Sequence, residues 1–142
     1  MPVMILSHKK LSYKWLRFAV TGIEALDQQH QGLLDRMNAL KEILTHGADP
    51  GETQARLLEL RTLFEQHFAD EDQRMMAWGF PGFAAHFKAH QAFLEGPLLQ
   101  TITDVQGQEG YDLGALIDWE AGHISRFDRP MAEYLLANPE TD

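Results

Sequence analysis

Apolar side chains recur every three or four residues in four separate stretches of the chain, which is the spacing of amphipathic helices. We expect helices at about 23–46, at about 53–78, from about 83 onward, and at about 113–136. Glycine- and proline-containing segments, such as 79–82, separate them. Because these connections are short, neighbouring helices should run antiparallel. The pattern predicts an all-α fold, namely an up-and-down antiparallel four-helix bundle with an extended N-terminal arm.

Pro97 interrupts the third helical stretch. A proline in a helix interior costs about 3 kcal/mol, so the helix should kink or end there, and a resumed helix through Leu98–Val105 is left open. The first 22 residues lack helical periodicity, which is why we expect an arm there. The expected organisation is an arm at 1–22, one bundle at 23–137 and a tail at 138–142.

Every predicted helix also carries histidine or carboxylate side chains among its inward apolar positions. In chain order these are His30, His67, Glu71, His86, His90, His123 and Asp128. Three pairs share a helix, and two of them have the four-residue spacing that stacks side chains on one face. Asp128 follows His123 by five residues, a rotation of about 140° in an α-helix. It would therefore have to reach inward from the edge of the inner face of the fourth helix. On the inner face of the third helix we also place Phe87.

Five imidazoles and two carboxylates suit a pair of metal ions, because imidazole binds iron, copper, nickel or zinc while carboxylates bridge cations and offset their charge. The chain has no cysteine, so thiolate ligands are excluded. A single inward histidine is usually an ordinary core or surface residue. Burying all seven groups without metal, however, would cost on the order of several kcal/mol each. The set favours two iron ions, with zinc and manganese left open, whereas His8 and His46 should be exposed.

The charge balance restricts the partners. Twenty-one acidic against twelve basic residues give a net charge of -9, which disfavours nucleic acid and anionic membrane surfaces. No apolar stretch approaches the roughly 20 residues of a membrane span, and the first residues do not form a secretory signal. We expect a cytoplasmic protein without a membrane or nucleic-acid partner, and the sequence does not indicate a protein partner.

The order of these residues resembles the hemerythrin family, in particular the single-domain bacteriohemerythrins, over about Trp15 to Leu136. The matching pieces are Trp15 with Val20-Thr21-Gly22-Ile23, Leu26-Asp27-Gln28-Gln29-His30, His67-Phe68 with Glu71, Met75 and Met76, Gly79-Phe80-Pro81 before His86 and His90, and Trp119 with His123-Ile124 and Asp128. The resemblance implies that one iron is fully ligated and the other keeps an open position. The ligands of the closed iron would be His86, His90 and His123. Those of the open iron would be His30 and His67, with Glu71, Asp128 and an oxo or hydroxo group as bridges.

The resemblance further implies reversible dioxygen binding, for storage, delivery or scavenging, at this non-haem diiron centre rather than enzymatic turnover. The oxygen pocket would comprise Leu33, Phe68, Trp119, Glu120 and Ile124. Glu120 departs from the family, which usually has leucine or a similar residue there. Its carboxyl group could donate a proton, ligate the metal or turn to solvent. Two alternatives therefore stay open: a sensor of oxygen or nitric oxide, and a diiron peroxidase or oxidase acting on oxygen or peroxide.

Overall fold

The computed structural model describes residues 20–47, 49–106 and 113–138. Their helices are α2 (Glu24–Thr45), α3 (Pro50–Trp78), α4 (Phe83–Glu95), α5 (Pro97–Gln106), α6 (Leu113–His123), the π-helical turn η1 (Ile124–Asp128) and α7 (Arg129–Ala137). The described part of the chain contains no strand. Most of the expected arm, including His8, lies outside the described residues, which begin at residue 20. The expected tail also lies outside them, except for Asn138.

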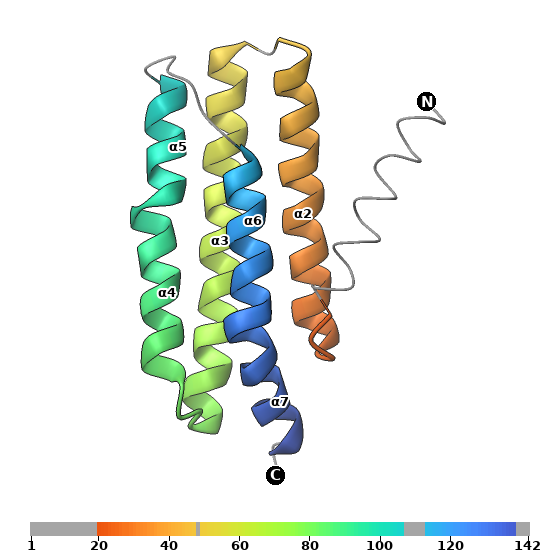
Figure 1. Cartoon of the computed structure of the whole chain (residues 1–142), viewed down its shortest axis with the longest axis vertical. Coiled ribbons are helices and arrows are strands. Elements are labelled where there is room, and N and C mark those ends of the chain that lie inside the picture. Colours follow the sequence, from red (N-terminus) through yellow and green to blue (C-terminus); the bar gives the residue numbers. More distant parts are fainter. Residues whose placement is uncertain (1–19, 48, 107–112, 139–142) are drawn as a thin grey trace, which may run out of the picture.

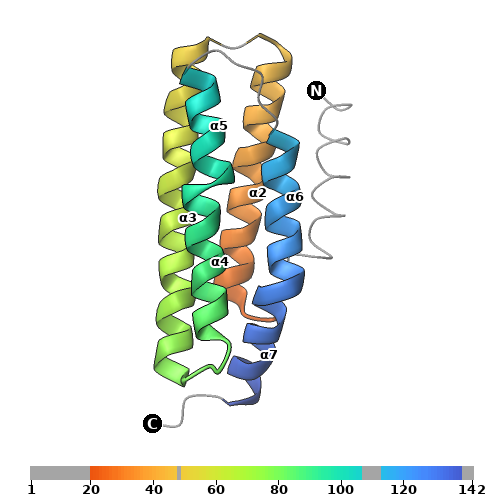
Figure 2. The same ribbon diagram turned by 60° about the vertical axis from the view of Figure 1, so that its left-hand side comes forward.

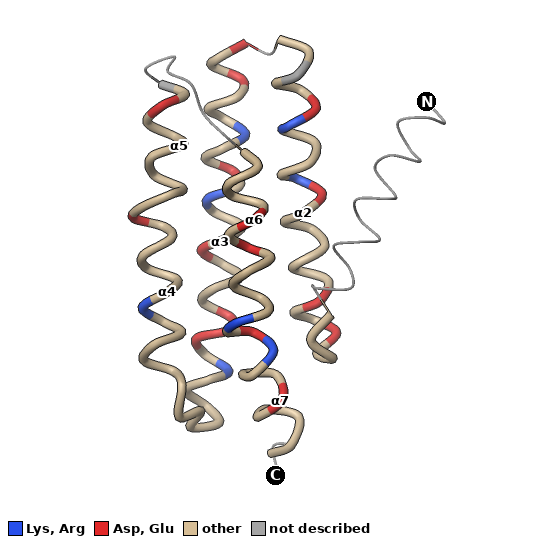
Figure 3. The backbone as a smooth tube through the Cα atoms, viewed as in Figure 1, with Lys and Arg blue, Asp and Glu red and all other residues tan. Residues whose placement is uncertain are grey.

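The helices form an all-α four-helix bundle, which confirms the predicted fold class (Figures 1 and 2). In Figure 1, α2 runs upward, α3 returns downward, α4 and α5 climb as one column, and α6 to α7 descend as the last. No helix among the described residues is long and apolar enough to cross a membrane. Lys and Arg positions are spread along several of these helices (Figure 3).

Local sequence sets where the first two helices begin and end. The Asp27 carboxylate accepts hydrogen bonds from the backbone N–H and the hydroxyl of Thr21, both at 2.7 Å, and so holds the chain entering α2. At the start of α3 the Asp49 side chain accepts from the N–H of Glu52, and Pro50 occupies the first turn. Gly79 ends α3 with a left-handed φ of 65°. These ends determine the register of the inner faces of both helices.

The third column breaks at Gly96 and then continues. Gly96 has φ -110° and ψ -101°, which are not helical angles, and Pro97 begins α5 directly after it. Proline is well tolerated in the first turn of a helix because the missing N–H would have no helical partner there. The open question at Pro97 is thus resolved: a second helix follows, and both α4 and α5 pack against α3.

The apolar core has two larger parts, with the polar cluster described below between them, and a small third part formed by Leu34 and Ile124. One part, toward the α2–α3 connection, includes Phe64, Phe93 and Leu116; the other, toward the opposite end, includes Leu26 and Met131. Assigning Phe87 to the inner face was wrong, since it is 41% exposed. It lies one residue, or about 100° of helix rotation, beyond the buried His86. There its ring contacts Phe83, with centroids 5.7 Å apart.

Candidate metal centre

Eight polar side chains that can bind metal are buried together between the two larger parts of the core. All seven residues predicted from the sequence are among them, and the eighth is Glu120. Their exposed fractions are 4% or less, and they are His30, His67, Glu71, His86, His90, Glu120, His123 and Asp128. His46, in contrast, is exposed at the end of α2, as expected.

Three imidazoles and two carboxylate oxygens form a first group. The Nε2 atoms of His86 and His90 each lie 3.1 Å from Nε2 of His123. Oε1 of Glu71 lies 3.0 Å from Nε2 of His90 and 3.3 Å from Nε2 of His86. Oδ1 of Asp128 lies 2.9 Å from Nε2 of His86 and 3.2 Å from Nε2 of His123. Five potential ligand atoms therefore face one small volume.

The spacing of this first group fits a six-coordinate cation. Adjacent ligands of an octahedral ion with bonds of about 2.1 Å stand about 3.0 Å apart, which is the separation seen here. Three imidazole nitrogens cannot satisfy one another by hydrogen bonding, because each such contact needs one protonated and one bare nitrogen. A metal ion accepts a lone pair from every one of them. The donor set and its geometry both fit a metal site.

A second group lies on the other side of the same two carboxylates. Nε2 of His30 lies 3.0 Å from Oδ2 of Asp128 and 3.5 Å from Oε2 of Glu71, and Nε2 of His67 lies 3.0 Å from Oε2 of Glu71. Neither His67 Nε2 nor Glu71 Oε2 makes a hydrogen bond among the described residues, despite their proximity. The two atoms are directed at shared space rather than at each other, as ligand atoms are.

Glu71 and Asp128 each divide their oxygens between the two groups. Oε1 of Glu71 and Oδ1 of Asp128 face the first group, while Oε2 and Oδ2 face the second. A carboxylate with one oxygen toward each of two cation sites is arranged as a bridge. The residues thus form two adjoining half-sites that share two carboxylates.

The π-helical turn η1 brings Asp128 into the cluster, so the expected rotation of about 140° from His123 was wrong. Within η1, the N–H of Arg129 donates to the carbonyl of Ile124, an i→i+5 bond. This wider turn nearly aligns residues five apart, and such turns are frequent at functional sites. Pro130 follows two residues after the end of η1 and has no N–H to close a regular α-helical bond. Asp128 is fully buried as a result.

A chain of hydrogen bonds to Nδ1 of His67 leaves the Nε2 atom of this ring unprotonated. The Nε of Arg74 donates to Asp70 at 2.9 Å, and Nε2 of Gln29 donates to the same carboxylate at 2.8 Å. The carbonyl oxygen of Gln29 then faces Nδ1 of His67 at 2.7 Å. Because Asp70 can only accept, the amide orientation of Gln29 is fixed, and Nδ1 of His67 must donate. The lone pair of the imidazole is therefore on Nε2, which faces the second group.

His90 is oriented in the same way. Its Nδ1 donates to Oδ1 of Asp72 at 2.9 Å, which leaves Nε2 bare toward the first group. Sequence reasoning missed Gln29 and Asp72, although each is adjacent in the chain to a predicted ligand. Both are polar residues beside a buried stripe, and periodicity alone assigns such residues to the surface.

The electrostatics of the cluster favour added positive charge. Burial by itself lowers the pKa of an imidazole, yet Asp128 and Glu71 raise the pKa of His30 to about 11 and that of His86 to about 9. Burial opposes ionisation of Glu71 as well, but His67 and His30 hold the pKa of its carboxyl well below the usual range. Protons or metal ions can supply this charge, and both compete for the same nitrogens.

Aromatic rings cover the first group. Phe68 stacks on the imidazole of His90 with centroids 4.0 Å apart, and Trp119 stacks on that of His123 at 4.6 Å. Leu33 and Phe68 are buried in the core, Ile124 is fully buried against Leu34, and Trp119 is half-buried. Of the five residues predicted for the oxygen pocket, Phe68 and Trp119 thus contact imidazoles of the cluster, and Leu33 and Ile124 are buried apolar residues.

Glu120, the fifth, points inward and not to solvent. It is 0% exposed, and neither carboxylate oxygen has a hydrogen-bond partner among the described residues. Burial raises the pKa of its carboxyl group despite the opposing charges of His67 and His30. Of the orientations of Glu120 that the sequence left open, the structure therefore has the inward one and not the one toward solvent.

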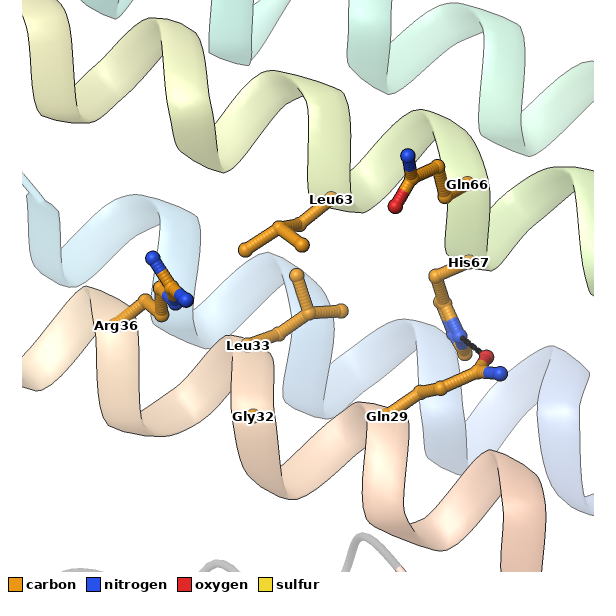
Figure 4. Close-up of a pocket in the computed structure, with 7 residues that line it drawn as sticks. All are labelled: Gln29, Gly32, Leu33, Arg36, Leu63, Gln66 and His67. Atoms are coloured by element: carbon orange, nitrogen blue, oxygen red, sulfur yellow. Dashed lines mark hydrogen bonds between the residues drawn. The ribbon is translucent and has the colours of Figure 1, made fainter.

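A surface pocket of about 240 Å³ reaches the second group between α2 and α3. Its lining is Gln29, Gly32, Leu33, Arg36, Leu63, Gln66 and His67. Figure 4 shows the Gln29 and His67 side chains meeting at one end of it. Of the buried cluster, His67 is the residue that lines this pocket.

The comparisons with known proteins agree with this site. The family model for the Hemerythrin HHE cation binding domain matches residues 21–135. The chain is 27% identical to a bacteriohemerythrin of Stenotrophomonas maltophilia over 121 residues, covering 82% of this chain and 77% of that one. It is 26% identical to a myohemerythrin of Theromyzon tessulatum over 116 residues, 82% of this chain and 88% of the relative.

A bacteriohemerythrin of Pseudomonas paraeruginosa is 30% identical over 114 residues, which are 76% of this chain and 71% of that protein. No solved structure is significantly similar to the chain. The matched segment includes all four columns of the bundle and every residue of the buried cluster. The chain belongs to the hemerythrin family.

Proposed function

We propose that the bundle, residues 23–137, binds dioxygen reversibly at a non-haem diiron centre. The observation that carries this proposal is the division of Glu71 and Asp128 between two groups of imidazole nitrogens. Two half-sites sharing two carboxylates need two cations. Family membership supports iron as the metal and dioxygen as the ligand.

Each half-site would hold one iron. His86, His90 and His123 would hold the first, His30 and His67 the second, and Glu71 and Asp128 would bridge them together with a solvent-derived oxo or hydroxo group. The iron pair, when bound, supplies the electrons that dioxygen takes up on binding and returns on release. The remaining side chains keep the site dry and hold the ligands in place.

Water exclusion is the main task of the protein in such a mechanism, since protons and water promote irreversible loss of reduced oxygen species. Phe68 and Trp119 stack on imidazoles of the cluster, and Leu33 lines the pocket between α2 and α3 together with His67. A small neutral molecule can reach His67 through this pocket. The hydrogen bonds that His90 and His67 donate through Nδ1 to Asp72 and Gln29 hold these two imidazoles in place while it does so.

A second candidate function is a diiron peroxidase or oxidase, and the buried Glu120 favours it. A carboxyl group beside the second half-site supplies either a proton or an anionic ligand, and both promote reactions of oxygen that do not reverse. No comparable observation favours the oxygen or nitric oxide sensor.

The test is to add oxygen to the reduced, iron-loaded protein and then remove it under argon. Reversible binding predicts a charge-transfer absorption that appears with oxygen and disappears on its removal, over repeated cycles. Immediate conversion to a stable oxidised spectrum, with hydrogen peroxide consumed or released, would contradict reversible binding and support the second candidate.

A further inference from the structure

We propose that Glu120 is a metal ligand that completes the half-site of His30 and His67, so that this centre has three carboxylates rather than two. The inference rests on the proposed dinuclear site. It concerns a residue that the bridging arrangement does not use.

The unpartnered state of Glu120 is the first observation. Its side chain is 0% exposed, and both of its oxygens lack a hydrogen-bond donor among the described residues. Glu71 and Asp128, equally buried, each approach several imidazole nitrogens within 3.5 Å. Glu120 is thus the one carboxylate of the cluster without such a contact among the described residues.

The position of Glu120 is the second observation. One of its oxygens lies within 4.8 Å of the ligand atoms of His30, His67 and Asp128, a second group that shares only Asp128 with the first. Opposite ligands of an ion with bonds of about 2.1 Å stand about 4.2 Å apart, so four atoms at these separations can surround one ion with small side-chain adjustments. Glu120 precedes His123 by three residues, so α6 and η1 supply both half-sites.

Neither protonation state of Glu120 satisfies its oxygens without a cation. An ionised carboxylate in the core needs positive charge beside it, and a neutral carboxyl group needs an acceptor for its O–H. Within the described part of the chain, neither oxygen of Glu120 makes a hydrogen bond. A metal ion between His30, His67 and Glu120 satisfies the ionised form directly.

Ligation by Glu120 has a consequence for incoming molecules. The position left open beside His30 and His67 is then taken, and an external ligand binds there only when Glu120 gives way. The third carboxylate also adds negative charge, which stabilises the metals in their higher oxidation state. Both effects move the centre away from the simple carrier implied by the bridging residues alone.

The test uses cobalt(II) as the probe, since the intensity of its visible absorption rises as its coordination number falls from six. Metal-free protein is titrated with cobalt chloride, comparing the wild type with Glu120→Leu and with the control Asp118→Leu, which removes an exposed carboxylate from the same helix. We expect two ions per chain for all three proteins. Glu120→Leu should bind one of them at least about tenfold more weakly and absorb more intensely.

The outcomes separate the inference from the proposed function. Unchanged affinities and spectrum in Glu120→Leu would overturn ligation by Glu120 while leaving the dinuclear site intact. A wild type that takes up fewer than two ions would overturn the dinuclear site itself.

The melting temperature of each protein is also measured with and without cobalt. The gain in melting temperature on adding cobalt should not change if Glu120 only fills space in the core. Without metal, Glu120→Leu should melt at a higher temperature than wild type, because a buried unpaired carboxyl group is removed. With metal, its gain in melting temperature should be smaller than that of wild type. An equal gain in both proteins would overturn the inference, and Glu120→Gln, which keeps the shape of the side chain, repeats the test if Glu120→Leu does not fold.

Discussion

At the scale of single residues, the cluster depends on side chains that touch no ligand position themselves. Gln29 and Asp72 hold the Nδ1 atoms of His67 and His90, and so determine which nitrogen of each ring is bare. Six residues of the set could be predicted from the sequence because each falls on an inward stripe, whereas Asp128, five residues after His123, was expected only at the edge of that stripe. Gln29 and Asp72 could not, since a polar residue beside a stripe usually faces solvent. The orientation of Glu120 could not be predicted, because a carboxylate on the same helix face as His123 can either point inward or swing out to solvent.

Replacing Gln29 with leucine should weaken metal binding without removing a candidate ligand. His67 loses the acceptor for its Nδ1–H, and its ring is no longer held with Nε2 toward the second half-site. Loss of such an outer hydrogen bond typically lowers metal affinity by about 10- to 100-fold, which competition with a chelator measures. Gln28→Leu, at the exposed neighbouring position, is the matched control and should bind like wild type. Equal affinities in all three proteins would refute the role of Gln29.

At the scale of elements, the π-helical turn η1 is the feature that helical periodicity could not predict. Counting 3.6 residues per turn rotates Asp128 away from His123, whereas the i→i+5 bond of η1 returns it to the cluster. Pro130, two residues after the end of this turn, was the available signal. The four columns themselves were predictable from their apolar stripes, and α5 became a separate helix because Gly96 and Pro97 both interrupt regular geometry.

Substituting Pro130 with alanine tests whether proline supports this turn. Alanine restores an N–H that can bond to the carbonyl four residues earlier, which favours a regular α-helix and rotates Asp128 out of register. We expect metal affinity to fall several-fold while circular dichroism shows the helical content retained. Pro97→Ala, at the start of α5 and away from the cluster, serves as the control and should leave affinity unchanged. Wild-type affinity in Pro130→Ala would mean that η1 does not depend on the proline.

At the scale of the whole molecule, four antiparallel columns meet around one buried polar cluster with apolar core on both sides. Each column supplies at least one imidazole, and the columns therefore need one another to complete either half-site. Burying such a cluster without cations costs free energy, because the negative charge of the carboxylates then has no positive charge to compensate it. Metal binding and folding of the bundle are thereby linked, and the metal should stabilise the folded chain.

The most direct measurement is X-ray absorption fine structure at the iron edge, on protein loaded with iron and assayed for metal content. Two half-sites that share Glu71 and Asp128 predict two irons per chain, each with a second iron at roughly 3 to 4 Å and a first shell of nitrogen and oxygen. A single iron per chain, or two irons with no iron neighbour at that distance, would contradict the shared-carboxylate centre.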